Sequence, residues 1–567
     1  MTKTFLSFIA VAIAFVACKK TALDIKIQKS GLVVDSAMVV SAHPLASEAG
    51  AKILKQGGNA VDAAIAVQFA LAVVYPVAGN IGGGGFMVIR EKNSQTATLD
   101  FREKAPAGAG RDMYLDENGE VVENLSLRGH LAAGVPGSVA GMAEAYEKYG
   151  SMSWKALIQP AIDLAAKGFK LTAREARALN RNQEAFMQYN TVTPENVINT
   201  KGWEEGQTIK YKDLAKTLTL ISEHGRDGFY KGRTAKNIVE EMARGGGIIS
   251  LEDLENYQAK WRPALTGIYK GYKIISMPPP SSGGVALLQL LKSVEPHAIG
   301  ELGHNTAAAV HLMTEAERRV YADRATHLGD PDYWNVPVAQ LVDSAYNARR
   351  MLSYNPDSAT RSQEITAGQP LLAERLETTH FSVVDKYGNA VSVTTTLNGG
   401  FGSKVFVAGS GFLLNNEMDD FSIKPGFPNY YGLIGGEANA IEPGKRMLSS
   451  MTPTIVEKHG ELFMVVGTPG GSTIITSVFQ TILNVLDHGM NMQQAVDAGR
   501  VHHQWKPDTI FTETEALDSS SILLLQSMGH HVVDRGSIGL VDAILIRKDG
   551  KLEGGADRRG DDTAAGY

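Results

Sequence analysis

The stretch that decides the fold runs from Glu377 to Ser403 and reads ETTHFSVVDKYGNAVSVTTTLNGGFGS. Two segments rich in Val and Thr, His380–Asp385 and Ala390–Leu397, flank Lys386–Asn389. The Gly-Asn pair inside that short connection is typical of a tight turn between antiparallel strands. The stretch therefore predicts a β-hairpin in which most residues at odd positions share a buried face.

The entry to this hairpin is unusual, because Thr378 and Thr379 directly follow the acidic residue Glu377. Threonine pairs are common in strands, so the pair alone predicts no more than a strand. Its significance depends on the rest of the chain.

Composition indicates a soluble globular protein. The chain has 567 residues, of which 44% are hydrophobic and 20% are charged, enough for two to four domains or one large layered domain. The formal net charge of −6 gives no electrostatic reason to expect nucleic acid as a partner.

Residues 1–17 are typical of an export signal, since a positive charge precedes the apolar run Phe5–Val16, which is too short to span a bilayer comfortably. Cys18 is the only cysteine and stands where bacterial lipoproteins carry the lipidated residue, although Phe15 departs from the usual aliphatic residue of that motif. We therefore expect an exported, periplasmic or cell-envelope protein, anchored by lipid at Cys18, with 18–35 as a tether. The alternative is a plain signal peptide cut nearby, with an incidental cysteine.

The order of the expected elements indicates two sheets between helical layers. A strand at Met38–Ala42 precedes two helices, and a glycine-rich turn then leads into further strands. The two helices are expected at Ser47–Gln56 and Ala60–Val74, later strands at Phe412–Leu414, Thr454–Glu457, Leu462–Val466 and Leu540–Arg547, and later helices at Ile474–Leu486 and Met492–Ala498.

Two segments lie between these halves. His311–Arg324 has the pattern of a strongly charged helix. Ala345–Gln369 is polar and poor in large apolar residues, which predicts an exposed, mobile segment leading into Glu377.

Several common catalytic motifs are absent from the sequence. It contains no Gly-x-Ser-x-Gly, His-Glu-x-x-His or Gly-x-Gly-x-x-Gly motif and no cysteine pair, and the glycines of Gly82–Gly85 lack the Gly-Lys-Ser/Thr of a phosphate loop. His502-His503 and His530-His531 have no carboxylates at ligand spacing, so we expect no metal site there. Nothing in the sequence requires a cofactor.

A hydroxyl nucleophile without an obvious histidine base remains. Threonine becomes nucleophilic when a nearby group takes its proton, and its own α-amine, with a pKa near 8, is one such group. That amine exists only after the chain is cut before the threonine. A mobile segment ending at Glu377, followed by Thr378 at the head of a core strand, suits such a cut.

The motif ETTHFSVVDKYGNAVSVTTTLN resembles the processing and nucleophile motif of γ-glutamyltranspeptidases, which are N-terminal-nucleophile hydrolases. The resemblance covers nearly the whole mature chain, through GNIGGGGFMV, DFREKAP, GVPGSVAG, PPPSSGG, NNEMDDF, KRMLSSMTPT, GTPGGS and HHQW. It implies an α+β fold, a four-layer αββα sandwich that two subunits of one precursor build jointly. Residues 36–377 would form the large subunit and 378–567 the small catalytic subunit.

The resemblance also implies the reacting groups. Thr378 would be the nucleophile and, through its hydroxyl, the group that cuts the Glu377–Thr378 bond, while Thr396 would hydrogen-bond the nucleophile. The backbone N–H groups of Gly470 and Gly471 would form the oxyanion hole, where a side chain would obstruct the approach.

A γ-glutamyl donor carries an α-carboxylate and an α-ammonium, and both need partners when they leave water. By resemblance, Arg102, Ser449 and Ser450 would bind the carboxylate, and a guanidinium suits that task because it bonds bidentately. Asn398, Glu417 and Asp420 would hold the ammonium.

The segment PGFPNYYGLIGG at 425–436 resembles the loop that covers the donor pocket in this family, with Tyr431 as the covering aromatic. Family members that act as cephalosporin or glutaryl acylases tend to lack this loop. We therefore expect a γ-glutamyltransferase and glutathione hydrolase that passes the glutamyl group to water, an amino acid or a dipeptide. The alternatives are a β-lactam side-chain acylase of the same fold and a non-catalytic peptide-binding lipoprotein.

Overall fold

The computed structural model describes residues 30–366 and 378–567. The expected signal segment, the lipidation site Cys18 and the cleavage residue Glu377 lie outside the described residues. No helix in the described ranges combines the length and the apolar character that a membrane crossing needs.

The predicted hairpin is confirmed and lies in the middle of a sheet. Strand β10 (Thr379–Val384) pairs with β11 (Ala390–Thr396), with Phe381 opposite Val393, and the Asp385 N–H donates to the Asn389 carbonyl at 3.0 Å across the turn. Within the described residues the sheet has seven strands in the order β19-β2-β10-β11-β3-β4-β7. The other strands are β2 (Met38–Ser41), β3 (Gly84–Arg90), β4 (Thr96–Asp100), β7 (Lys260–Arg262) and β19 (Thr563–Gly566).

A second sheet packs face to face on the first. Over the described residues it also has seven strands, in the order β1-β18-β17-β13-β12-β9-β8. Apolar side chains fill the space between the sheets, such as Val40 and Phe86 from the first and Ile455 and Ile544 from the second. The strands are β1 (Val33–Val34), β8 (Leu265–Tyr269), β9 (Tyr272–Ser276), β12 (Thr454–Lys458), β13 (Glu461–Gly467), β17 (Asp542–Ile546) and β18 (Leu552–Ala556).

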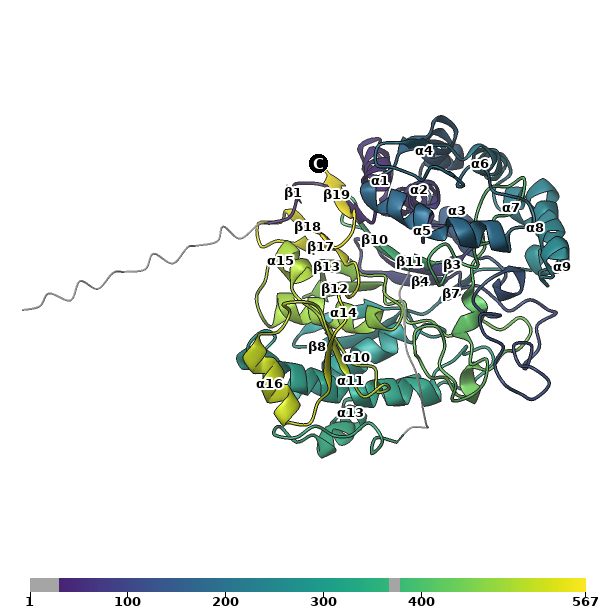
Figure 1. Cartoon of the computed structure of the whole chain (residues 1–567). Helices are drawn as coiled ribbons and strands as arrows, with labels where there is room; N and C mark the ends of the chain where they lie inside the picture. Colours follow the sequence, from purple (N-terminus) through teal and green to yellow (C-terminus); the bar gives the residue numbers. More distant parts are fainter. Residues whose placement is uncertain (1–29, 367–377) are drawn as a thin grey trace, which may run out of the picture.

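Helices cover the outer face of each sheet, which completes the predicted four-layer αββα sandwich (Figure 1). Helix α2 (Ala60–Val74) has the predicted bounds, begins with a capping box at Asn59 and is buried on all sides. Helices α1 (Pro44–Lys55), α2 and α4 (Trp154–Lys167) lie over the hairpin sheet, and α10 (Gly283–Val294), α11 (Ala307–His327) and α14 (Thr473–Leu486) lie over the second.

The remaining elements are short or peripheral. The helices are α3 (Ser138–Tyr149), α5 (Ala173–Tyr189), α6 (Lys212–His224), α7 (Asp227–Tyr230), α8 (Gly232–Gly245), α9 (Leu251–Glu255), α12 (Val338–Leu341), α13 (Ser344–Arg350), α15 (Met492–Asp497) and α16 (Ser519–Ser527). The strands are β5 (Phe169–Lys170), β6 (Thr208–Ile209), β14 (Val501–His502), β15 (Ile510–Thr512) and β16 (Val532–Asp534).

Two sequence-based expectations are wrong. Phe412–Leu414 is no strand, because Leu413 makes only an isolated bridge with Phe406. The segment expected to be exposed, Ala345–Gln369, begins in helix α13, and within its described part Ser362 and Ile365 are buried. It packs there because polar groups of helix α11, which is itself buried despite its charges, bind its backbone and side chains.

Both sheets combine strands from either side of the Glu377–Thr378 bond. Strand β10 lies between β11 and β2, and β11 in turn pairs with β3, so 340 residues or more separate some neighbours along the chain. The second sheet likewise joins β9 to β12. Among the described residues, neither half of the chain therefore supplies all the strands of either seven-stranded sheet.

Asp385 ties the hairpin to the helical layer. Its Oδ1 accepts the N–H groups of Tyr387 and Asn389, and its Oδ2 accepts the N–H of Ala60 at the start of α2 at 3.0 Å. The side chain is buried, so its removal leaves several donors without partners.

We predict that Asp385→Ala lowers the free energy of unfolding by about 2–4 kcal/mol, because it removes several charge-assisted hydrogen bonds at once. Denaturant titration of the purified protein measures this loss. The neighbouring exposed Lys386→Ala serves as the control and should change stability by less than about 0.5 kcal/mol. Equal losses in both variants would contradict the assigned role.

Candidate active site

Thr378 and Thr396 lie side by side at one end of the hairpin. Thr378 directly precedes β10, Thr396 ends β11, and the register places their neighbours Thr379 and Thr395 opposite each other. Both threonines line one small cavity. The ends of β4, β12 and β13 reach the same edge, so loops from both sheets converge on Thr378.

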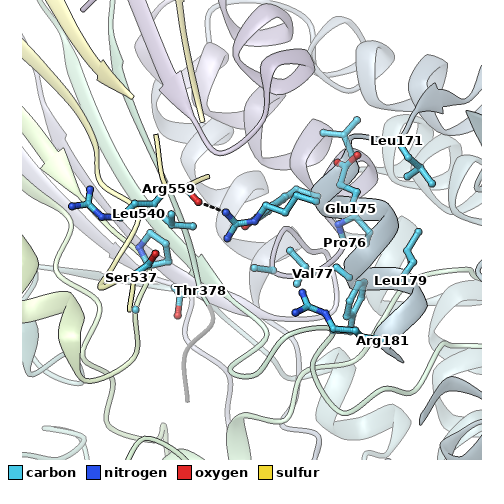
Figure 2. A pocket seen from close by; sticks show the side chains of 18 of the residues that line it. Pro76, Val77, Leu171, Glu175, Leu179, Arg181, Thr378, Ser537, Leu540 and Arg559 are labelled. Carbon is cyan, nitrogen blue, oxygen red and sulfur yellow. Dashed lines mark hydrogen bonds between the residues drawn. The ribbon is translucent and has the colours of Figure 1, made fainter. Parts of the chain in front are cut away.

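Two cavities adjoin Thr378. The smaller one, of about 20 Å³, holds most of the predicted substrate-binding residues. The larger one, of about 310 Å³, is lined by Thr378 and Gly470 among others, and Figure 2 shows Thr378 at its side. The predicted site residues lining the smaller cavity are Arg102, Thr378, Thr396, Asn398, Asp420, Tyr431, Ser449, Ser450 and Gly471.

Arg102 is the centre of a buried charge cluster. Its Nη1 lies 2.6 Å from Glu417 Oε2 and 3.3 Å from Glu103 Oε2, and its Nη2 lies 2.5 Å from Asp420 Oδ2. Burial raises the pKa of Glu103 to about 7 and raises the pKa values of Glu417 and Asp420, although Arg102 opposes each shift. One guanidinium therefore faces three buried carboxyl groups.

The cluster leaves acceptor atoms available for a cation. Asn398 Oδ1 is buried and accepts no hydrogen bond from any described residue, and beside it the buried Glu417 carboxyl contacts Arg102 and Thr396. Asn398 is fixed by its Nδ2, which donates to the Asn416 carbonyl at 2.9 Å. Buried acceptors without donors are costly, and an ammonium group in this cavity would supply the missing donors.

Gly470 and Gly471 connect β13 to α14 in left-handed conformations, with φ of 144° and 52°. In the described chain, neither N–H donates a hydrogen bond to another residue, whereas the Gly470 carbonyl accepts the Thr473 N–H at 3.0 Å. A Cβ at Gly471 would lie 2.2 Å from the Tyr431 ring. This turn therefore presents two free N–H donors beside Thr378, and no side chain fits at Gly471.

Tyr431 covers the smaller cavity. Its hydroxyl donates to the Asn398 carbonyl, and its ring lies against Gly471. Asn429 fixes the conformation of this loop. Its Oδ1 accepts the Tyr431 N–H at 3.0 Å, and its Nδ2 donates to Asp420 Oδ1 at 2.9 Å. A volume of about 20 Å³ holds about one water molecule, so this loop must move to admit a larger ligand.

No histidine is placed to activate Thr378. The nearest in sequence, His380, uses Nδ1 on Thr394 Oγ1 at 2.9 Å and Nε2 on Ser382 Oγ at 3.1 Å, and burial lowers its pKa to about 3. Among the described residues that line the two cavities, none is a histidine.

His530 belongs to a polar network whose residues line neither of these cavities. It forms a group with His311 and Glu315 whose potential ligand atoms lie within 4.8 Å of one another. The two imidazoles already share a hydrogen bond of 2.7 Å, and the Glu315 carboxylate binds Arg319 and Thr360. These contacts satisfy the group without an ion.

Residues 46–567 match the protein family described as gamma-glutamyltranspeptidase. The chain belongs to the γ-glutamyltranspeptidase family. Among its relatives, a glutathione hydrolase proenzyme of Pseudomonas sp. strain A14 is 49% identical over 514 residues, which cover 90% of this chain and 89% of that protein.

Solved structures agree with this membership. A cephalosporin acylase from Bacillus halodurans superposes with a TM-score of 0.81 at 25% identity and covers 97% of this chain and 99% of its own. A γ-glutamyltranspeptidase from Helicobacter pylori is 46% identical, with a TM-score of 0.57, and covers 62% of this chain and 99% of its own. The fold is thus that of the N-terminal-nucleophile hydrolases.

Sequence reasoning missed Arg324 of helix α11. Its Nη2 donates to Ser450 Oγ at 3.1 Å and its Nε to Ser282 Oγ at 2.9 Å. It forms no ion pair within the described ranges, and burial lowers its pKa to about 10. It therefore adds positive charge behind the serine hydroxyls of this family member. No signal in the sequence distinguished it from the other charges of its helix.

Asn80, in the glycine-rich turn, is a second missed residue. Its Nδ2 donates to Thr395 Oγ1 at 3.1 Å and to the Thr396 carbonyl at 2.9 Å, and its Oδ1 accepts the Gly83 N–H at 3.1 Å. It fixes the end of β11 where Thr396 lies. The string GNIGGGG contains it, but the glycines alone suggested only close packing.

Asp419 is a buried titratable residue that binds the backbone of the loop carrying Tyr431. It accepts the Tyr430 N–H at 2.7 Å and the Ser126 hydroxyl at 2.8 Å, and burial raises its pKa to about 7. The unfolded chain has a pKa near 3.9 at this residue. The folded state thus binds the proton more tightly, and this contribution to stability is lost as pH rises from about 4 through 7.

We predict that Asp419→Asn shows a smaller loss of unfolding free energy between pH 5 and 7.5 than the unmodified protein, because the amide carries no titrating proton. Denaturant titrations at the two pH values measure the difference. The exposed Asp112→Asn provides the control and should keep the original pH dependence. An unchanged pH dependence in Asp419→Asn would contradict the raised pKa.

Proposed function

We propose that the protein is a self-processing glutathione hydrolase and γ-glutamyltransferase. The observation that carries the proposal is the position of Thr378, between free backbone N–H groups and a cavity whose charges complement an α-amino acid. Family membership and the glutathione hydrolase relative support the same reaction. No step requires a cofactor.

Donor recognition follows from the charges. The guanidinium of Arg102 and the hydroxyls of Ser449 and Ser450 would bind the α-carboxylate of the γ-glutamyl group, with Arg324 behind Ser450. The Glu417 carboxylate and Asn398 Oδ1 would receive the α-ammonium, and Asn398 Oδ1 accepts no hydrogen bond from another described residue. With the donor held in this way, its γ-carbonyl would lie at Thr378 and the carbonyl oxygen would point toward Gly470 and Gly471.

The base would be the α-amine of Thr378. An α-amine has a pKa near 8 and titrates close enough to neutrality to accept the hydroxyl proton. The amine forms only after the bond to Glu377 is cut, and the same hydroxyl would attack that peptide carbonyl, giving an ester that water hydrolyses. The mature enzyme would then be a heterodimer of 36–377 and 378–567.

The reaction proceeds by two acyl transfers. Thr378 Oγ bonds to the γ-carbonyl carbon while its proton passes to the α-amine, and the oxyanion accepts hydrogen bonds from the two glycine N–H groups. The carbon–nitrogen bond then breaks, and the leaving amine takes the proton. Water, or the amine of an amino acid or dipeptide, then attacks the γ-glutamyl ester and gives a proton to the α-amine. The ester C–Oγ bond breaks, and the α-amine passes that proton to Thr378 Oγ, which restores the free threonine.

A β-lactam side-chain acylase is the second candidate, because the cephalosporin acylase shares the fold. The Tyr431 loop and the cluster around Arg102 favour a γ-glutamyl substrate over a glutaryl one. A glutaryl group has no α-ammonium to neutralise these carboxyl groups. Turnover of glutathione, compared with that of glutaryl-cephalosporin under the same conditions, separates the two. A non-catalytic binding protein would turn over neither.

We predict that Thr378→Ala remains a single uncut chain and releases no p-nitroaniline from γ-glutamyl-p-nitroanilide, because it has neither the attacking hydroxyl nor the later nucleophile. Gel electrophoresis and absorbance measure the two outcomes. Thr378→Ser is the matched control and should retain both processing and activity, at a lower level. Two normal fragments from Thr378→Ala would remove Thr378 from its proposed role.

We predict that Arg102→Lys raises the KM for a γ-glutamyl donor by about 10-fold or more, since an ammonium replaces a bidentate fork. The change in kcat should be smaller, because the contact exists in both the ground and transition states. Steady-state kinetics of the processed variant measure both constants. An unchanged KM would exclude Arg102 from the donor site.

The location is a separate proposal, based on the sequence alone. The protein would be exported and held at the cell envelope by lipid on Cys18. We predict that Cys18→Ser moves the enzyme from the membrane fraction to the soluble fraction, as measured by fractionation and activity. Membrane association that persists in this variant would contradict lipidation.

A further inference from the structure

The larger cavity shares Thr378 with the smaller one, and none of its other lining residues is common to both. Thr378 lines both cavities, whereas Gly471 lines only the smaller and Gly470 only the larger. Figure 2 shows Thr378 between helix α5 and the segment carrying Ser537 and Leu540. A γ-glutamyl group in the smaller cavity would direct the other half of the substrate into this space.

The side chains that line this cavity include apolar groups and arginines. Phe169, Leu179 and Phe401 are buried and supply apolar surface. Arg181 extends from helix α5 toward the side where Thr378 lies (Figure 2), and it forms no ion pair or hydrogen bond within the described chain. Arg174 also lines the cavity but is engaged with the Arg559 carbonyl.

One acidic group reaches the cavity, and it already has a partner. Glu175 Oε1 lies 3.0 Å from His43 Nε2, and its Oε2 accepts the Thr172 N–H at 2.7 Å. Arg181 is therefore the unpaired charge among the residues discussed, and it favours an anion near the mouth of the cavity.

A buried hydroxyl gives an independent indication of a ligand. Tyr211 lines the cavity and is 2% exposed, yet its hydroxyl has no hydrogen-bond partner in the described structure. A buried hydroxyl without a hydrogen-bond partner is unfavourable. A ligand carbonyl would accept this hydrogen bond.

We propose that this cavity binds the amine half of the substrate, a short peptide with a free carboxylate such as cysteinylglycine, and that Arg181 pairs with that carboxylate. The inference rests on the proposed function and adds the recognition of the group that leaves. By microscopic reversibility, the same cavity receives a dipeptide acceptor, whose amine loses a proton as its bond to the γ-carbonyl carbon forms. The Tyr211 hydroxyl would donate to the peptide carbonyl. The apolar side chains of Phe169, Leu179 and Phe401 would contact the peptide side chain.

The test compares glutathione with its C-terminal glycine amide as donors for the purified, processed enzyme. The ratio of their kcat/KM values reports recognition of the carboxylate and does not depend on the amount of active enzyme. We expect the unmodified enzyme to prefer glutathione and Arg181→Gln to reduce that preference by about 5–10-fold, typical for loss of one charge-assisted contact. Arg177→Gln, an exposed arginine on the same helix that does not line the cavity, should keep the original ratio.

Results that overturn this proposal differ from those that overturn the proposed function. An unmodified enzyme that cleaves both donors equally, or a ratio in Arg181→Gln equal to that in Arg177→Gln, overturns the proposal. An unmodified enzyme that matures but cleaves neither donor nor γ-glutamyl-p-nitroanilide would instead remove the proposed function, and this inference with it.

Two further variants test the cavity itself. Ala178→Phe narrows it and should lower kcat/KM for glutathione at least 5-fold more than for γ-glutamyl methylamide, whose leaving amine is small. Tyr211→Phe should raise the KM for a glycylglycine acceptor without lowering the melting temperature, because the hydroxyl has no partner in the protein. Equal effects of Ala178→Phe on both donors would contradict occupation of this space by the leaving group.

Discussion

The pairing of strand β10 with β2 on one side and β11 on the other is the constraint on which the site depends. It holds the residue at the head of β10 at a fixed place along the sheet edge, whether or not a peptide bond precedes it. The loops carrying Arg102 and Gly470 follow β4 and β13, and the loop carrying Ser449 leads into β12, all at the same edge. Antiparallel neighbours within two stacked sheets thus bring together residues that are hundreds of positions apart.

The chemistry of the site is set by charge in a small volume. Arg102 is surrounded by three carboxyl groups, while Arg324 forms no ion pair with any residue that the structure describes. Such an arrangement is expensive when no ligand is bound, because each buried charge is incompletely compensated. A zwitterionic amino acid corrects both imbalances at once, which explains why recognition would be selective for a group carrying both charges.

Much of the fold could be predicted from the sequence where local signals were strong. Helix α2 has an Asn cap and an unbroken apolar run, and the hairpin has alternating strands around a Gly-Asn turn. The segment around Ser362 was misjudged because polarity suggested exposure, although its partners are buried charges of α11.

Most residues of the candidate site were predicted from motif resemblance and not from the hydrophobic periodicity of their segments. The roles of Arg324 and Asn80 escaped notice because each acts through a residue distant in sequence, Ser450 and Thr395 respectively. Propensity describes a residue's own segment, and these contacts exist only in the assembled sheets.

Because both seven-stranded sheets contain strands from both halves of the chain, cleavage between the halves would change how the protein can refold. An intact chain keeps its two halves at a high effective concentration, so unfolding and refolding are unimolecular. Once the link is severed, reassembly would require two separate polypeptides to meet, and the free energy of unfolding would depend on their concentration. The mature enzyme would then persist through the slowness of its unfolding rather than through ready renaturation, and each molecule would have one opportunity to fold, before it acquires its activity.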